Sequence, residues 1–117
     1  MNTEKQENLA ILDSFITLQD NWDGCNAVAP EEQIIKLVKD FILQLKWQPE
    51  IFPTPDGGIQ LEYTVGANQH LNIEILSEQT VNIFEMFADR PYSEETIHYD
   101  VEDIKRRIDR FYGYKAQ

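Results

Sequence analysis

Glu62 and Glu74 are the two residues of this sequence whose types and spacing point most directly to chemistry. Each lies in a segment where apolar and polar residues alternate, which is typical of a half-buried β-strand. If residues 66–70 form the loop between the segments, Val65 pairs with Leu71 and the apolar residues all share one face. This register predicts that Glu62 stands directly opposite Glu74 on the polar face.

Four interpretations of this carboxylate pair are open. Both side chains could extend into water, where solvent screens their repulsion. They could form a docking surface for a cationic partner, hold a divalent metal ion together with His70, or act as an acid/base pair in hydrolysis. Two carboxylates are few ligands for a metal ion, and the sequence offers no substrate-binding motif. Among the functional interpretations, docking is therefore the one that we carry forward.

The residues around the pair extend the predicted docking surface. A turn at residues 77–79 would place Asn82 beside Glu74, and Asp56 lies in the turn before the first clear strand. The predicted partner-binding residues are Glu62, Glu74, Gln60, Asn72, Asn82 and Asp56. They are polar or acidic, and we expect them to contact a basic surface of a protein partner.

The distribution of charge supports this expectation. The net charge is −11, and residues 47–89 carry seven acidic residues and no Lys or Arg. An unneutralised negative field attracts basic partners and repels nucleic acid and anionic membranes. We therefore expect no nucleic-acid and no membrane partner. The plain alternative is that the charge only keeps the protein in solution.

The remaining reactive residue types lack partners at useful spacing. His70 and His98 have no metal-ligand neighbours in the sequence, and Cys25 has no nearby histidine. Gly57-Gly58 precedes a predicted strand and is not followed by the Lys-Ser/Thr of a phosphate-binding loop. We therefore expect no catalytic residue, no metal site and no cofactor, with a small metal-dependent hydrolase using Glu62 and Glu74 as the alternative.

A basic cluster lies near the C-terminal end of the chain. It consists of Lys105, Arg106, Arg107 and Arg110. On a helix, Arg106 and Arg110 share a face, and so do Arg107 and Arg110. The cluster could be a solvated face, or it could contact the acidic sheet within the chain or in a second copy, which would make the protein a structural homo-oligomer subunit.

Three helices and a sheet must position these residues. Helical periodicity predicts helices over residues 5–20, from Pro30 to about Lys46, and from about residue 100 or 101 to 111. Strands are predicted at residues 51–52, 59–65, 71–76 and 80–87, and a loop at 88–99. The expected fold class is α+β: two N-terminal helices, an antiparallel meander of three to four strands with one face covered by helices, and a C-terminal helix. Residues 1–117 form one domain.

Two loops carry the most distinctive local sequences. After the first predicted helix, Trp22 should pack at the rim of the core, Asp23 should bond backbone N–H groups, and Gly24 should end the helix. Gly57 and Gly58 should form a turn with Asp56, because glycine reaches positive φ without strain.

These loops carry a family resemblance. The segments N-W-D-G at 21–24 and P-T-P-D-G-G-I-Q-L-E-Y at 53–63 resemble those of a widespread group of small uncharacterised bacterial proteins, whose second motif reads P-x-P-D-G-G-I-x-L-E-W. The likeness covers roughly residues 20–76 and includes L-N-I-E-I at 71–75. Tyr63 replaces the usual Trp, and Asn26 a frequent glycine. The resemblance implies this fold and a bacterial or phage origin, without an activity.

The sequence as a whole predicts a cytoplasmic, non-enzymatic interaction module. A single cysteine excludes an intramolecular disulfide, and the N-terminal residues lack the features of a signal peptide. The expected role is that of an accessory, antitoxin-like, immunity-like or phage-encoded inhibitory protein, with mimicry of nucleic acid as a special case.

Overall fold

Five antiparallel strands in the computed structural model form one sheet in the order in which they occur in the chain. The structure describes residues 3–114. Short connections suit this meander, because an antiparallel neighbour can be reached by a tight turn. The strands are β1 (Glu50–Pro53), β2 (Ile59–Val65), β3 (Gln69–Ile75), β4 (Val81–Phe87) and β5 (Arg90–Ile97).

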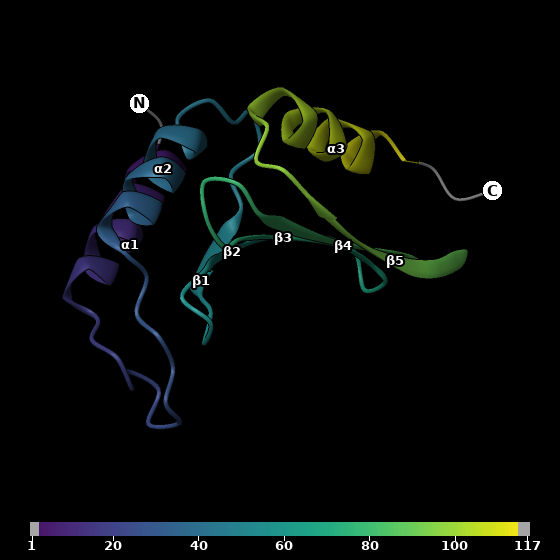
Figure 1. Cartoon of the computed structure of the whole chain (residues 1–117). Coiled ribbons are helices and arrows are strands. Elements are labelled where there is room, and N and C mark those ends of the chain that lie inside the picture. Colours follow the sequence, from purple (N-terminus) through teal and green to yellow (C-terminus); the bar gives the residue numbers. More distant parts are fainter. Residues whose placement is uncertain (1–2, 115–117) are drawn as a thin grey trace.

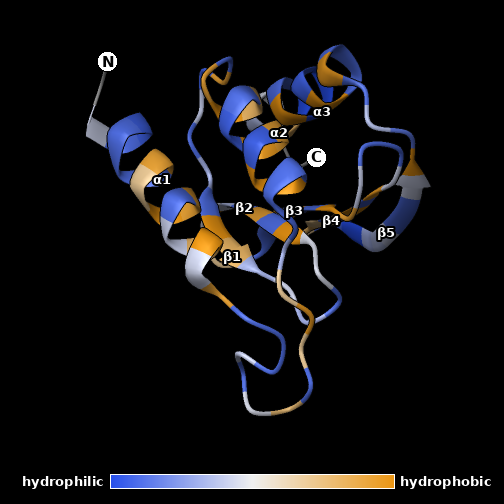
Figure 2. Ribbon diagram, turned by 60° about the vertical axis from the view of Figure 1, so that its left-hand side comes forward, coloured by the Kyte–Doolittle hydropathy of each residue, from blue (hydrophilic) through white to orange (hydrophobic). Residues whose placement is uncertain are grey.

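Three helices lie on one side of this sheet (Figures 1 and 2). They are α1 (Thr3–Ser14), α2 (Glu32–Ile42) and α3 (Val101–Gly113). The other face of the sheet has no helix over it among the described residues. This arrangement confirms the predicted α+β class, the two N-terminal helices and the single C-terminal helix.

The core lies between the helices and the covered face of the sheet, which we call the inner face. Alternate residues of the strands point into it, and so do the apolar stripes of α2 and α3. Each fully buried side chain of this kind stabilises the fold by about 1.5–3 kcal/mol. The most completely buried include Ile59, Leu61, Leu71, Ile73, Ile75, Val38, Phe41, Ile42, Ile104 and Phe111.

The two N-terminal helices end earlier than predicted. α1 ends at Ser14 and continues as one 3₁₀ turn, Phe15–Thr17. There the hydroxyls of Ser14 and Thr17 donate to backbone carbonyls of the preceding turn, which competes with regular helix. α2 ends at Ile42 instead of about Lys46, and the Gln48 amide donates to the Ile42 carbonyl at 2.8 Å.

A fifth strand replaces the loop predicted at 88–99. A proline normally interrupts a sheet, but Pro91 lies in β5, an edge strand, where the missing N–H of a proline leaves no hydrogen bond of the sheet unmade. In the strand predicted at 80–87, Val81 and Ile83 are buried on the inner face, and Phe84 and Met86 lie on the other face. The edge strand expected at residues 51–52 is present as β1.

The C-terminal helix begins and ends close to the predicted residues. The side chain of Asp100 caps α3 by accepting a hydrogen bond from the Asp103 N–H at 3.1 Å. None of the described helices has the length and apolar character that crossing a membrane requires.

Candidate functional site

The uncovered face of the sheet, here called the outer face, gathers the predicted partner-binding residues. Its side chains alternate along each strand with those of the inner face. They come from all five strands and include four glutamates, but no Lys or Arg of the described strands, since Arg90 of β5 stands opposite Phe87 of the inner face. The outer face consists of Glu50, Phe52, Gln60, Glu62, Thr64, His70, Asn72, Glu74, Asn82, Phe84, Met86, Tyr92, Glu94 and Thr96.

The predicted pairing of Glu62 with Glu74 is wrong. Glu62 stands opposite Asn72, and Glu74 stands opposite Gln60. The loop contains only residues 66–68, and Gly66 takes a positive φ of 66° there. The register thus differs by two residues from the predicted one, which leaves every side chain on its expected face but changes its partner.

Two rows of side chains run across the outer face in the observed register. One row joins Phe52, Gln60, Glu74, Asn82 and Thr96. The predicted neighbourhood of Glu74 and Asn82 is therefore correct. The next row joins Glu50, Glu62, Asn72, Phe84 and Glu94. Glu62 does have a like-charged neighbour, but this neighbour is Glu50 on the edge strand β1.

Glu74 shares a hydrogen bond with Asp56, which comes from the turn between β1 and β2. Partial burial and the hydrogen bond to Asp56 raise the pKa of Glu74. Burial alone would also raise the pKa of Asp56. Hydrogen bonds from Thr54, Glu74 and backbone amides outweigh this effect, so the pKa of Asp56 is lowered. Of the two carboxyl groups, Glu74 therefore binds a proton more tightly than Asp56.

The turn that supplies Asp56 depends on its glycines. Thr54 is buried, its hydroxyl donates to Asp56 Oδ1 at 2.5 Å, and it accepts a hydrogen bond from the Gly58 N–H at 3.0 Å. A Cβ on Gly58 would lie 2.9 Å from Thr54 Oγ1 and 3.0 Å from the Ile75 carbonyl oxygen. Gly57 has a φ of +87°. The predicted Asp-Gly-Gly turn is therefore confirmed, and it fixes Asp56 against the outer face.

The second distinctive loop packs against this turn. The Trp22 indole donates to the Val28 carbonyl at 3.1 Å, and Asp23 Oδ1 accepts from the N–H groups of Cys25 and Ala27. The Val28 N–H in turn donates to the Pro55 carbonyl at 2.8 Å. The role predicted for Asp23 is thus confirmed, and the Trp22 N–H is bonded, although Trp22 is not among the side chains packed against the core. The prediction that Gly24 ends the first helix is wrong, because the helical segment ends at Thr17 and Gly24, with a positive φ of 76°, lies in the loop. Both loops support the position of Asp56.

A hollow of about 410 Å³ lies at the centre of the outer face. Phe84 lines it, with Glu74 and Glu94 on neighbouring strands. Tyr92 packs against Phe84 with ring centroids 5.4 Å apart. The sequence-based prediction missed Tyr92 and Glu94 because it treated residues 88–99 as a loop, and it did not assign Phe84, in the predicted strand at 80–87, to the outer face. The β-forming residues of the segment Tyr92–Ile97 carried the available signal.

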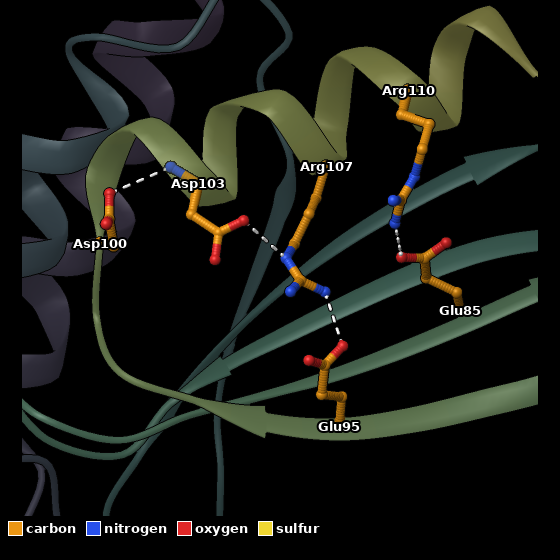
Figure 3. Close-up of polar contacts among 6 residues, drawn as sticks. All are labelled: Glu85, Glu95, Asp100, Asp103, Arg107 and Arg110. Carbon is orange, nitrogen blue, oxygen red and sulfur yellow. Dashed lines mark hydrogen bonds and ion pairs between the residues drawn. The ribbon is translucent and has the colours of Figure 1, made fainter.

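The basic cluster lies over the inner face, on the opposite side of the sheet from these glutamates. Figure 3 shows Arg107 between Asp103 and Glu95, with nitrogen–oxygen distances of 3.1 and 3.0 Å, and Arg110 on Glu85 at 2.7 Å. These contacts raise the pKa of Arg107. The cluster therefore contacts acidic strands within the chain.

The remaining members of the cluster are placed differently. Lys105 lies 3.9 Å from Glu102 on its own helix, and Arg106 is exposed. An oligomer contact through all four residues, Lys105, Arg106, Arg107 and Arg110, would compete with the three intrachain ion pairs of Arg107 and Arg110.

The other candidate reactive groups stay apart. His70 lies on the outer face within 3.3 Å of Thr64 Oγ1 and the Ala67 carbonyl, while Cys25 is exposed in the loop. Within residues 3–114, no three His, Cys, Asp or Glu side chains are grouped so that they could hold a metal ion. Comparison of the chain with protein families, with curated proteins and with solved structures finds no significant match.

Proposed function

We propose that this protein is a non-enzymatic interaction module that binds a basic surface of a protein partner through its outer face. The observation that carries the proposal is the separation of charge across the sheet. Four glutamates lie on the outer face without a described Lys or Arg among them, whereas Arg107 and Arg110 neutralise acidic residues on the inner face. The open face thus keeps its negative field, and the covered face does not.

This field favours rapid encounter with a cationic surface. Complementary potentials steer association and raise its rate, and the effect weakens as salt screens the charges. Glu62 and Glu74 remain central to the proposal as neighbours in adjacent rows, with Gln60, Asn72 and Asn82 between or beside them as hydrogen-bonding groups.

Apolar side chains on the same face supply contact area. Phe52 is 41% exposed and Tyr92 is 63% exposed, and both lie among the glutamates. Aromatic residues dominate the energetics of many protein interfaces, and their faces attract cations. A surface that combines aromatic rings with carboxylates suits lysine and arginine side chains, whose stems are apolar and whose ends are charged.

The competing functions lack a comparable observation. A metal-dependent hydrolase built on Glu62 and Glu74 would need further ligands, and the described residues offer no group of three. A homo-oligomer that joins α3 to the sheet of another copy would use Arg107 and Arg110, which already have partners within the chain. An accessory, antitoxin-like, immunity-like or inhibitory role, including mimicry of nucleic acid, remains compatible with the proposed binding mode.

A pair of charge-matched double variants tests the proposal. Glu62→Gln with Glu94→Gln removes two of the four glutamate charges of the outer face, and Glu7→Gln with Glu32→Gln removes the same charge from exposed positions on α1 and α2. Poly-L-lysine serves as a basic probe. The affinities of proteins captured from a bacterial lysate are then measured one by one by calorimetry. We expect the outer-face variant to bind at least roughly tenfold more weakly than the helix variant, with binding that falls as salt rises. Equal binding by the two variants would overturn the proposal.

A further inference from the structure

The hollow at the centre of the outer face combines three kinds of chemistry in one place. Its volume is about 410 Å³, and its wall includes the ring of Phe84, the carboxylates of Glu74 and Glu94, and the side-chain amides of Asn72 and Asn82. Phe84 lies between Asn72 on β3 and Glu94 on β5 in the sheet register. A ligand that enters the hollow would meet an aromatic ring and carboxylates together.

The polar groups of the hollow are mainly hydrogen-bond acceptors. The amide of Gln60 donates to Glu62 at 2.6 Å, which leaves its carbonyl oxygen as an acceptor. The Thr96 hydroxyl donates to Asn82 Oδ1 at 2.8 Å, and the Asn82 amide in turn donates to Glu74, so both donors already have partners. Glu94 is exposed, and a carboxylate accepts hydrogen bonds without donating any. A ligand that carries several donors would therefore fit the hollow best.

A guanidinium group meets these conditions better than an ammonium group. It is planar and permanently charged, it presents five N–H donors in a fixed fork, and it stacks on aromatic rings. An ammonium group is compact and strongly hydrated, and it loses more by leaving water. An anion would meet the negative charges of Glu74 and Glu94, and a metal ion would lack a group of three suitable ligands among the described residues.

We propose that the hollow around Phe84 receives an arginine side chain of the basic partner, so that arginine and not lysine anchors the complex. The guanidinium would lie against the Phe84 ring and donate to the carboxylates of Glu94 and Glu74. Tyr92, whose ring packs on Phe84, would cover the stem of the arginine. This inference rests on the proposed function, and it names the group by which the outer face recognises its partner.

Three blocked tripeptides test the inference directly. Their central residue is arginine, lysine or citrulline, which keeps the shape of arginine and lacks its charge. Each peptide is titrated into the isotope-labelled full chain, and backbone amide shifts are followed by NMR. We expect saturable shifts on β3, β4 and β5 with arginine, affinity for lysine lower by roughly fivefold, and no saturation with citrulline. Equal affinity for arginine and lysine, or shifts that lie elsewhere, would overturn the inference.

A matched pair of variants separates the ring from general hydrophobicity. Phe84→Leu keeps an apolar side chain in the hollow, and Phe52→Leu makes the same change on β1, outside the hollow. We expect Phe84→Leu to remove the preference for arginine over lysine and Phe52→Leu to retain it. Amide dispersion of each free variant shows whether it is folded.

The poly-L-lysine experiment distinguishes the two proposals. If poly-L-lysine binds the outer face and loses affinity in the Glu62→Gln/Glu94→Gln variant, but the arginine peptide shows no preference, the arginine inference fails and the proposed function stands. If neither probe depends on the outer face, both fail.

Discussion

Arg110 reaches from α3 to the inner face of the sheet, where its Nη2 donates a 2.7 Å hydrogen bond to Oε1 of Glu85 (Figure 3). Glu85 is only 8% exposed, whereas the Arg110 side chain is 64% exposed. The glutamate therefore depends on the arginine much more than the arginine depends on the glutamate, because a buried carboxylate without a partner is costly.

Removing this arginine should destabilise the fold. We expect Arg110→Met to lower the free energy of unfolding by about 1–2 kcal/mol, because it leaves Glu85 without its hydrogen bond. Arg106→Met, at an exposed position of the same helix, serves as the control. Urea denaturation measures both, and the double variant Arg110→Met/Glu85→Met should recover most of the loss. Equal stabilities for the two single variants would contradict the dependence of Glu85 on Arg110.

Gly58 and Gly24 should respond differently to alanine, because their backbones face different obstacles. A Cβ on Gly58 would lie 2.9 Å from Thr54 Oγ1 and 3.0 Å from the Ile75 carbonyl oxygen. We expect Gly58→Ala to cost about 2–3 kcal/mol and to displace the turn that holds Asp56. At Gly24 nothing lies within 4 Å of the added atom, and only the φ of +76° resists it, at a cost of about 1 kcal/mol.

Thermal unfolding of the two glycine variants tests this order. The NMR shift of the Glu74 side chain provides a second measurement, which should change in Gly58→Ala and stay constant in Gly24→Ala. A larger loss at Gly24 than at Gly58 would contradict the close packing around the turn.

The sequence predicts which side of the sheet each residue occupies, but not which residue stands opposite. A shift of two residues leaves the alternation intact, so the five-residue and three-residue loops bury the same apolar side chains. The conformation of the loop decides between the two registers, because Gly66 adopts a positive φ of 66° and allows Val65 to pair with Gln69. Hydrophobic periodicity contains no information on that choice.

The contribution of β5 to the candidate site could not be predicted from the sequence for a different reason. Residues 90–97 have little apolar alternation, because β5 is an edge strand whose residues are nearly all exposed. Exposure removes the pattern from which a strand is predicted. Glu85 illustrates the converse limit. A glutamate in a sequence is expected at an exposed position, and its burial can be predicted only when its partner, here Arg110, is known.

The observed register itself leads to a prediction at Glu50 and Glu62. These residues stand opposite each other on β1 and β2, where like charges are destabilising. We expect Glu50→Lys to raise the free energy of unfolding by about 0.5 kcal/mol at low salt, with a smaller gain at high salt, because it makes an attractive pair. Glu78→Lys, at an exposed position of the β3–β4 turn, makes the same change of net charge without a cross-strand partner. Equal gains in both variants would show that net charge, not the pairing, is responsible.

The proton of Glu74 makes stability depend on pH in a defined direction. Burial and the hydrogen bond to Asp56 raise the pKa of Glu74 in the folded state, so the folded protein holds this proton more tightly than the unfolded chain. The resulting stabilisation is complete below the unfolded pKa, near 4.5, and is lost as the pH rises through the folded value. Asp56 acts in the opposite direction, because its pKa is lowered and its contribution is lost as the pH falls.

Glu74→Gln isolates the contribution of Glu74, since the amide can still donate to Asp56 but does not ionise. We expect the variant to have a higher melting temperature than the wild type at pH 7, and the difference to shrink as the pH approaches 4. Glu78→Gln removes an exposed carboxylate of the adjacent turn and should show a smaller difference with a weaker pH trend. Melting curves between pH 4 and pH 8 at constant ionic strength measure both. A difference in melting temperature that is constant across this range would contradict the raised pKa of Glu74.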